Sequence, residues 1–494
     1  MRANLEAYLP IRAFLTLCAH PPSGDSTIPT TNKRFAVFAV SYAASTKQRK
    51  TGGECDDRDK ISNKALKLIA KKAIVKLVTI INGILRLRYF PTQWKHASVI
   101  LIPKPGKDPT YPQNYRPISL LSNISKVAEK VIFLRILKDL ATTNSIPPEQ
   151  FGFRAAHETN LQLLRVTELI TRNFNTRQHT GLILFYDKKA FDNVWHTGLV
   201  IKMCKSKINL KIVQLIQSFL HNRSFQVCFE NHLSSVRQIT AGVPQGSVLS
   251  PTLYNIYTHD VPKHPKTDLA LYADDTAIIA TSRSPQLITQ RLQEHTDSLI
   301  NYYAKINLNK TQAILFTKRR ASQHQNILIN NQAIEWIKQI KYMGLTLDTS
   351  LTYKTHLINA ANKTKSALKS LNSLLCRKTH LNLANKRLLY LSTLRPILSY
   401  ASPCWGSAAS SNLSHILTVQ NKIIRQISNA PWFIRNKNLE KDLKIPNLKD
   451  FIKKLNQDFA NRTGTSNNPS LTYTIDYDTK TSFKYTRPLQ SCMQ

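Results

Sequence analysis

Hydrophobic residues follow two different spacings along this chain, and each spacing predicts a different kind of element. Spacing of three and four residues, typical of one helix face, predicts helices over 65–87, 125–140, 160–173 and 199–220. Short apolar runs rich in strand-forming residues predict strands over 97–102, 181–186, 224–229, 233–240, 269–272 and 276–280. Helical spacing returns over 355–375, 385–395 and 411–428. This mixture predicts an α+β fold followed by a helical C-terminal region.

Changes in composition divide the 494 residues into four parts, and this length predicts roughly two or three domains. Residues 1–60 are irregular and end in a polar run, 46–60, so we expect a disordered leader there. Ser62 is an N-cap candidate at the start of the second part, 61–350. The third part, 351–461, is predicted to be helical. The last part, 462–494, is rich in Thr, Ser, Asn and Tyr, and we expect it to be disordered.

The charge of the chain indicates a partner that carries many phosphates. Lysine and arginine total 69 residues against 29 aspartates and glutamates, and the formal net charge of +40 is spread along the chain. An anionic membrane surface is the competing partner. However, no apolar run approaches the ~20 residues that span a bilayer, and no long basic amphipathic helix is evident. Nucleic acid is therefore favoured, and no membrane contact is expected.

The cysteines and the N-terminal residues indicate in which cellular compartment to expect the protein. The seven cysteines are scattered, with no C-x-x-C pair and no Cys/His cluster of zinc spacing. This pattern indicates reduced thiols in an intracellular protein, which we expect in the nucleus and cytoplasm rather than secreted. No secretory signal is evident, although the basic, acid-poor first 50 residues leave a transit peptide open.

Two adjacent carboxylates stand between two predicted strands. Asp274 and Asp275 follow the apolar run 269–272 and precede the run 276–280, which predicts a hairpin with both carboxylates at its tip. Two hard anionic side chains held side by side suit Mg²⁺, which takes oxygen ligands and a substrate phosphate. The alternative is an ordinary hairpin with a solvated turn.

Other polar residues are candidates for the same site. Asp187 ends the apolar strand 181–186, where a carboxylate is unfavourable unless it is paired or bound to a cation, so it suits a third metal ligand. Lys104 and Arg116 lie in a loop-rich basic cluster that could bind phosphate oxygens, or could be solvated surface charge. His196 follows Trp195 at a helix edge and is better explained as a structural residue than as a base.

An ordered series of blocks resembles the reverse transcriptases of non-LTR retrotransposons, most closely those of jockey-like elements. The blocks are residues 114–122 (NYRPISLLS), 150–154 (QFGFR), 189–196 (KAFDNVWH), 241–251 (AGVPQGSVLSP), 272–275 (YADD), 307–316 (NLNKTQAILF), 342–345 (YMGL) and 394–406 (LRPILSYASPCWG). The resemblance covers about residues 61–455. Any one block is a weak signal, but the ordered set is specific.

The resemblance implies a right-hand polymerase fold, with fingers and palm in 61–350 and a thumb and connection region in 351–461. It implies an RNA-directed DNA polymerase that extends a DNA primer on an RNA template with deoxynucleoside triphosphates. It also implies two Mg²⁺ ions, with Mn²⁺ as an alternative metal. The implied metal ligands are Asp187, Asp274 and Asp275; Lys310 would assist the leaving group; Lys104, Arg116, Phe191, Gln245 and Gly246 would bind the nucleotide; and Tyr342, Met343 and Gly344 would grip the primer.

Departures from the family pattern leave a second hypothesis open. The family aspartate stands three residues before the lysine of the KAFD block, whereas Asp187 stands two residues before Lys189. Either a bulge brings Asp187 to the metals, or Tyr186 occupies the ligand position. The family's KAPGPDGI finger loop is missing before Ile61, and the 60-residue leader is too short for an endonuclease domain. The alternative is therefore a truncated, catalytically inactive remnant that only binds nucleic acid.

Overall fold

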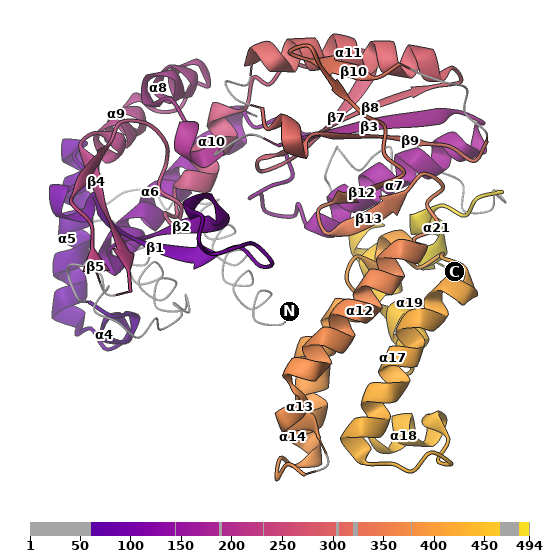
Figure 1. The fold of residues 1–494 in the computed structure, drawn as a ribbon. Helices are drawn as coiled ribbons and strands as arrows, with labels where there is room; N and C mark the ends of the chain where they lie inside the picture. The colour runs from indigo at the N-terminus through magenta and orange to yellow at the C-terminus, as the bar shows by residue number, and fades with distance from the viewer. Residues whose placement is uncertain are drawn as a thin grey trace, which may run out of the picture. The chain divides into compact units, whose positions relative to one another are not determined.

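The computed structural model describes residues 61–143, 145–186, 190–230, 232–302, 306–319, 325–376, 378–464 and 484–493. The chain divides into two compact units (Figure 1): unit 1 is Met1–Arg135 with Gln214–Gln238, and unit 2 is Ile136–Val213 with Ile239–Gln494. Both units contain helices and sheets, which confirms the predicted α+β class. The predicted leader, 1–60, lies outside the described residues.

Unit 1 is built on a sheet of strand order β2-β1-β4-β5, in which β6 also pairs with β4. Strand β1 (His96–Pro103) pairs antiparallel with β2 (Tyr115–Leu120) and parallel with β4 (Arg223–Phe229). The predicted strand 233–240 is instead divided into β5 (His232–Leu233) and β6 (Arg237–Ile239). Between them the Ser234 hydroxyl accepts the hydrogen bond of Val227 N in place of a backbone carbonyl, which interrupts regular pairing.

The helices of unit 1 agree in part with the predicted ones. Ser62 caps the first of them, because its hydroxyl accepts a hydrogen bond from Ala65 N at 3.1 Å. The predicted helix over 65–87 is interrupted at 68–70, where Ala70 adopts an extended conformation. The elements are α4 (Asn63–Lys67), α5 (Lys71–Leu87), η1 (Thr92–Trp94) and η2 (Pro112–Asn114), while α6 (Asn123–Thr143) and α9 (Leu210–Leu220) run from one unit into the other.

An antiparallel sheet of order β7-β8-β3-β9 is the centre of unit 2. Its strands are β7 (Thr267–Tyr272), β8 (Asp275–Ser282), β3 (His179–Tyr186) and β9 (Gln312–Phe316). Helix α7 (Thr159–Asn175) covers one face and α11 (Pro285–Tyr302) covers the other (Figure 1). On β3, Leu184 is buried on the α7 side and Phe185 on the α11 side. The uninterrupted apolar run of β3 follows from this burial of both faces.

Shorter elements surround this sheet. They are η3 (Ala190–Asn193), α8 (His196–Lys205), α10 (Ser250–Tyr257), η4 (Leu308–Lys310), the hairpin of β10 (Ile327–Ile329) with β11 (Gln332–Ile334), and the hairpin of β12 (Gln339–Tyr342) with β13 (Leu345–Asp348). The β12–β13 hairpin contributes Tyr342 and Leu345 to the core on the α7 side of the sheet. That core therefore joins the sheet to the helices that follow.

The helical C-terminal region follows, as predicted. Its elements are α12 (Lys354–Ser370), α13 (Asn372–Leu375), α14 (Leu383–Leu389), the π-helical turn η5 (Tyr390–Leu394), α15 (Arg395–Leu398), α16 (Ser402–Trp405), α17 (Ser410–Ser428), α18 (Asn436–Asp442) and α19 (Leu448–Gly464). Helices α12 and α17 lie side by side (Figure 1). The fully buried Trp405 and Tyr390 belong to the same core as Leu184 of the sheet. Within the described ranges, no helix has the length and hydrophobicity needed to cross a membrane.

The predicted disorder of residues 462–494 is wrong for 462–464, which end α19, and for 484–493. Helix α21 (Pro488–Met493) packs on α7, α16 and α19, and its Leu489 and Cys492 are buried. Arg487 forms an ion pair with Glu168 of α7 at 2.7 Å, and both side chains are almost fully buried. The polar composition of the tail did not indicate this order, because the partner that neutralises Arg487 lies more than 300 residues earlier. Residues 465–483 lie outside the described part.

The cysteines agree only in part with the predicted reduced thiols. Cys204, Cys376, Cys404 and Cys492 are free, whereas Cys228 of β4 is disulfide-bonded. Spacing along the chain does not indicate such a bond, because pairing depends on which segments folding brings within reach.

Candidate active site

Asp274 and Asp275 lie at the tip of the β7–β8 hairpin predicted from the sequence, Asp274 in the turn and Asp275 as the first residue of β8. Tyr272 pairs with Asp275 across the hairpin, and Ala273 and Asp274 form the turn between them. The side chain of Asp274 is exposed, and that of Asp275 is half-buried. The hairpin therefore presents two neighbouring carboxylates at one end of the sheet.

Tyr186, at the end of β3, is the cross-strand partner of Asp275. Paired residues of antiparallel strands project to the same face, so the phenol and the carboxylate share one side of the sheet. Burial, followed by the charges of Asp275 and Asp274, raises the pKa of Tyr186 to about 12. The phenol therefore stays protonated beside the carboxylates at neutral pH. Asp187 lies outside the described residues, so its place as a third ligand stays a prediction.

Lys310 places a positive charge near Tyr186 and the two carboxylates. Asn307 N donates a hydrogen bond to Tyr186 O at 2.9 Å, which ties the turn before β9 to the end of β3. The Lys310 Nζ atom then lies 5.9 Å from the centroid of the Tyr186 ring. Burial, and after it the charge of Asp274, raise the pKa of Asp275 to about 6, although the charge of Lys310 opposes this.

The chemistry of these donors fits a hard divalent cation. Two carboxylates close together supply the oxygen ligands that Mg²⁺ prefers. A bound cation would offset the burial and, after it, the repulsion from Asp274 that raise the pKa of Asp275. In the part of the chain that the structure describes, no group of three or more His, Cys, Asp or Glu side chains could hold a metal ion.

Asp275→Asn is expected to stabilise the metal-free protein at pH 7.5 by about 1–3 kcal/mol. The folded-state pKa of Asp275, about 6, lies above the ordinary value of 3.8. Its contribution to stability is therefore fully present below about pH 4 and is lost as the pH rises through about 6. Asparagine resembles the protonated form, so its advantage should disappear at about pH 4.

Urea unfolding in the presence of EDTA at both pH values measures this difference. Asp268→Asn is the matched control, because Asp268 is an exposed acid on β7 of the same hairpin. Equal stability of the parent protein and Asp275→Asn at pH 7.5 would show that the charge of Asp275 does not destabilise the folded protein.

The loop at 241–251 is held against the segment that follows β3. Val243 N donates to Phe191 O at 2.8 Å, and the Gln245 side chain donates to Asp192 Oδ1 at 2.9 Å. A Cβ atom on Gly242, whose φ is +89°, would lie 2.7 Å from Asp192 O, so only glycine permits this close approach. The predicted nucleotide-binding residues Phe191 and Gln245, and Gly246 next to Gln245, are thereby brought together.

His196 supports this loop, in agreement with its predicted structural role. Its Nε2 atom lies 2.7 Å from Gly242 O and can donate a hydrogen bond to that carbonyl. Phe191 is also fixed, because its ring stacks on Tyr254 of α10 with centroids 4.7 Å apart and planes at 20°. Tyr254 itself is buried. The ring of Phe191 therefore has a rigid backing.

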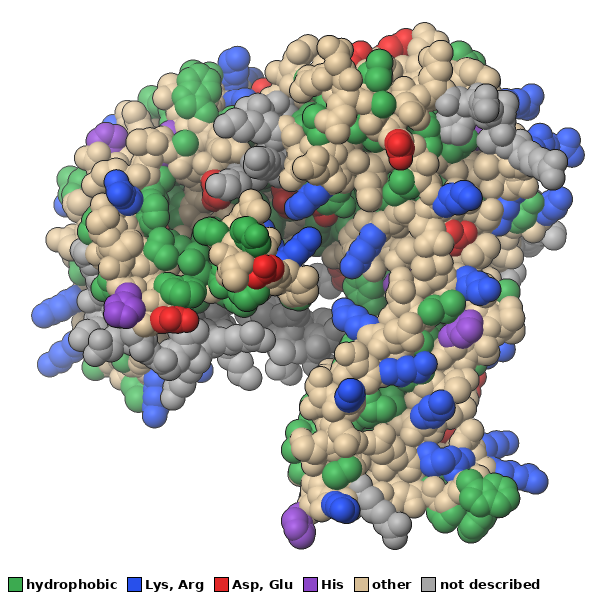
Figure 2. Space-filling model, in the orientation of Figure 1, with side chains coloured by type: hydrophobic (Ala, Val, Ile, Leu, Met, Phe, Trp, Pro, Cys, Tyr) green, Lys and Arg blue, Asp and Glu red, His purple; other side chains and the backbone are tan. Residues whose placement is uncertain are grey.

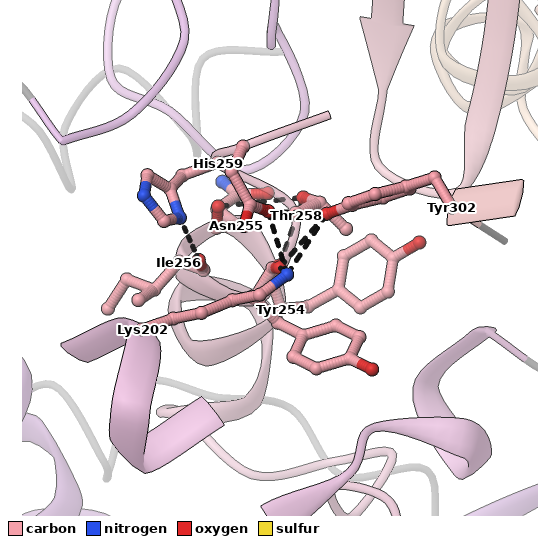
Figure 3. Close-up of polar contacts among 9 residues, drawn as sticks. Lys202, Tyr254, Asn255, Ile256, Thr258, His259 and Tyr302 are labelled. Atoms are coloured by element: carbon pink, nitrogen blue, oxygen red, sulfur yellow. Dashed lines mark hydrogen bonds and ion pairs between the residues drawn. The ribbon is translucent and has the colours of Figure 1, made fainter. Parts of the chain in front are cut away.

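A polar cluster at the end of α10 holds that helix in place (Figure 3). Lys202 of α8 donates hydrogen bonds to Tyr257 O and to Asp260 Oδ1, each at 2.7 Å, and to the Tyr302 hydroxyl at 3.2 Å. The Tyr302 hydroxyl also donates to Asp260 Oδ1 at 2.7 Å. Burial favours the neutral form of Asp260, but the Lys202 and Tyr302 hydrogen bonds outweigh it and lower its pKa. The cluster thus joins α8, α10 and α11.

The predicted primer-grip residues form the tight turn between β12 and β13. Met343 and Gly344 both have positive φ, +46° and +88°, while Tyr342 is buried. The Gln162 side chain of α7 donates to the Tyr342 hydroxyl at 3.3 Å, and the Tyr400 hydroxyl donates to Met343 O at 2.6 Å. The turn is therefore held from α7 and from the helical C-terminal region.

Lys104 and Arg116 lie in unit 1, near the end of the β1–β2 pair. Arg116 pairs with Ile102, and Lys104 directly follows β1. The Lys104 ammonium donates to Gln113 O at 2.7 Å, and Lys104 N donates to Asn114 O at 2.8 Å. The loop-rich basic cluster predicted from the sequence is therefore an ordered hairpin end, and its role as a phosphate site stays a prediction.

Several supporting residues were not identified from the sequence. Gln150 and Tyr400 stood inside recognised blocks without an assigned role, so the blocks were a usable signal for them. Gln162 stands outside every block, and nothing in the sequence pointed to it. Tyr254 follows the 241–251 block on α10, and no role was assigned to it from the sequence.

Comparison with known proteins gives matches over most of the chain. Residues 102–347 match the family described as reverse transcriptase (RNA-dependent DNA polymerase). An RNA-directed DNA polymerase from mobile element jockey of Drosophila melanogaster is 36% identical over 82% of this chain and 45% of its own length. A probable RNA-directed DNA polymerase from transposon X-element of the same organism is 34% identical over 84% of this chain and 46% of its own. The chain thus spans about half the length of these relatives.

Solved structures give a weaker match. Apo telomerase from Candida tropicalis aligns with 83% of this chain and 72% of its own at 13% identity and a TM-score of 0.38. A score of this size does not support the placement of any residue.

Proposed function

The chain belongs to the reverse transcriptases of non-LTR retrotransposons, and on that premise we propose that it is an RNA-directed DNA polymerase that extends a DNA primer along an RNA template. The observation that carries this proposal is the pair Asp274 and Asp275 at a hairpin tip, beside Tyr186 and Lys310. Family membership confirms the predicted right-hand polymerase fold. We assign the β7-β8-β3-β9 sheet to the palm.

Asp274 and Asp275, with Asp187 as the proposed third ligand, would hold two Mg²⁺ ions, and Mn²⁺ could replace them. When bound, such metals lower the pKa of the attacking hydroxyl and offset the charge on the transferring phosphate. The protein's own part is to hold both carboxylates at one edge of a rigid sheet. Lys310, next to this edge, would give a proton to the leaving pyrophosphate.

The remaining residues would bind and select the nucleotide. Lys104 and Arg116 would bind the triphosphate, for which Arg offers a bidentate fork and Lys a point charge. Gln245 and Gly246 would line the pocket for the template and the nucleotide. Phe191 would exclude a ribose 2′-hydroxyl, and its stacking on Tyr254 supports this role because a fixed ring cannot yield to the extra oxygen.

The helical C-terminal region would follow the sugar–phosphate backbone of the RNA–DNA hybrid that the template and primer form. Figure 2 shows Lys and Arg side chains spread over this region with few acidic ones between them. Helix α12 exposes Lys354, Lys363, Lys365 and Lys369, and neither α12 nor its neighbour α17 contains an acidic residue. Such a surface binds phosphates without reading base sequence, as a polymerase requires. The β12–β13 turn, Tyr342 to Gly344, would support the primer end.

Primer extension with the full chain tests the proposal. A labelled DNA primer is annealed to an RNA template and incubated with Mg²⁺ and deoxynucleoside triphosphates, and a reaction with EDTA is the control. Template-dependent lengthening of the primer supports the function. Tight binding of the annealed substrate without any extension would overturn it in favour of a remnant that only binds nucleic acid.

A further inference from the structure

The segment before α7 adds to the edge of the sheet immediately beside the carboxylate turn. Gln150 forms a parallel bridge with Leu271 of β7. Phe151 N donates to Leu271 O at 2.9 Å, and Leu271 N donates to Glu149 O at 3.1 Å. Gln150 therefore lies beside Leu271, which stands two residues before Ala273, the first residue of the turn. The side chain of Gln150 is only 1% exposed.

The Gln150 side chain binds both backbone polar groups of Ala273. Its Oε1 atom accepts hydrogen bonds from Ala273 N at 2.9 Å and from Gly152 N at 2.8 Å. Its Nε2 atom donates to Ala273 O at 3.4 Å. One buried amide therefore connects the turn that carries Asp274 to the segment before α7.

The turn needs such support because Ala273 has an unfavourable backbone conformation. Its φ is +57°, in the left-handed region, which costs about 1–2 kcal/mol for a residue with a Cβ atom. Ala273 directly precedes Asp274, so its backbone angles set the direction in which the carboxylates of Asp274 and Asp275 leave the hairpin. Without Gln150, the Ala273 N–H would also lose its acceptor.

Gly152, next to Gln150 in the same segment, lets the backbone approach the turn closely. An ideal Cβ on Gly152 would lie 2.2 Å from Ala273 N and 2.9 Å from Ala273 Cα, so a side chain there would push the turn away. The Asn255 side chain of α10 donates to Gly152 O at 2.9 Å and holds the glycine from its other side. The contact thus depends on three separate segments of the chain.

We propose that Gln150 is a positioning residue that holds Ala273 in its left-handed conformation and so aims Asp274 and Asp275 at a shared divalent cation. The proposal rests on the proposed function for the cation's role in phosphoryl transfer. Gln150 has no part in the chemistry itself. Its effect is on the affinity of the turn for the cation and on the rate of the step that depends on it.

Gln150→Leu in the full chain tests this, with Mn²⁺ alone as the probe and free Mn²⁺ measured by electron paramagnetic resonance. The dissociation constant for Mn²⁺ is expected to rise about 10–100-fold, as for other residues that orient metal ligands. Hydrogen exchange at Ala273 N–H should accelerate in metal-free protein. In primer extension, kcat should fall by a similar factor, and KM for the nucleotide should change little.

Gln420→Leu is the matched control, because Gln420 is an equally buried amide on α17 that accepts a hydrogen bond from the Tyr390 hydroxyl. It should lose stability without any change in Mn²⁺ affinity. Adding Ala273→Gly to Gln150→Leu should recover part of the Mn²⁺ affinity, because glycine adopts positive φ without strain. Loss of packing alone would not be rescued in this way.

Unchanged Mn²⁺ affinity and unchanged exchange at Ala273 in Gln150→Leu would overturn the proposal. If that variant folds poorly, Gln150→Met, which keeps the side-chain length, takes its place with the same expected results. If the parent chain does not extend primers, the proposed function fails on its own. The exchange measurement on metal-free protein still decides the role of Gln150 in that case.

Discussion

Asp274→Asn and Asp275→Asn are each expected to reduce the rate of primer extension at least about 10³-fold. The affinity for the primer–template should change by no more than about twofold. A bound metal contributes several kcal/mol to phosphoryl transfer, and each 1.4 kcal/mol corresponds to about tenfold in rate. Loss of an anionic ligand removes much of that contribution. The loss should therefore appear in kcat, since the hybrid is bound elsewhere by its phosphates.

Single-turnover extension and filter binding, run on the same preparations, separate the two effects. Asp268→Asn removes an equal charge from the same hairpin at an exposed position of β7, and it should retain the parent rate. Comparable rates for the parent and Asp274→Asn would mean that these carboxylates do not carry the catalysis. The higher stability expected for metal-free Asp275→Asn makes misfolding a poor explanation of any lost activity.

Glu168→Gln is expected to lower the free energy of unfolding by about 3–5 kcal/mol. Glu168 and Arg487 are 2% and 4% exposed, and their charged atoms lie 2.7 Å apart. Glu168 Oε1 also accepts a hydrogen bond from Leu489 N, so this carboxylate holds both Arg487 and α21. Glutamine would remove the negative charge that lies beside the buried Arg487 guanidinium, which is the unfavourable part of the change.

Urea unfolding of the full chain measures this loss. The matched control is Glu158→Gln, which breaks a surface ion pair with Arg462, where both side chains are more than half exposed, and which should change stability by less than about 1 kcal/mol. Replacing both Glu168 and Arg487 by leucine should recover part of the loss, because no buried charge remains. A change below about 1 kcal/mol in Glu168→Gln would show that the Glu168–Arg487 ion pair does not stabilise the fold.

Local patterns were sufficient for much of the fold. The strands on either side of Asp274 and Asp275, the cap at Ser62 and the helices of the C-terminal region all follow from spacing and residue type over a few neighbouring positions. Predictions failed where distant groups intervene. Ser234 interrupts a strand by bonding to Val227, and Arg487 orders a polar tail by pairing with Glu168.

The candidate site shows the same division. Local sequence predicts that Asp274 and Asp275 stand side by side in a turn, because β-strand formers flank them. It does not predict that Tyr186 would face Asp275, or that Gln150 would hold Ala273 from 123 residues away. Those contacts depend on strand register and on which edges meet. They arise only when the whole chain buries its apolar surface, and no short stretch of residues encodes them.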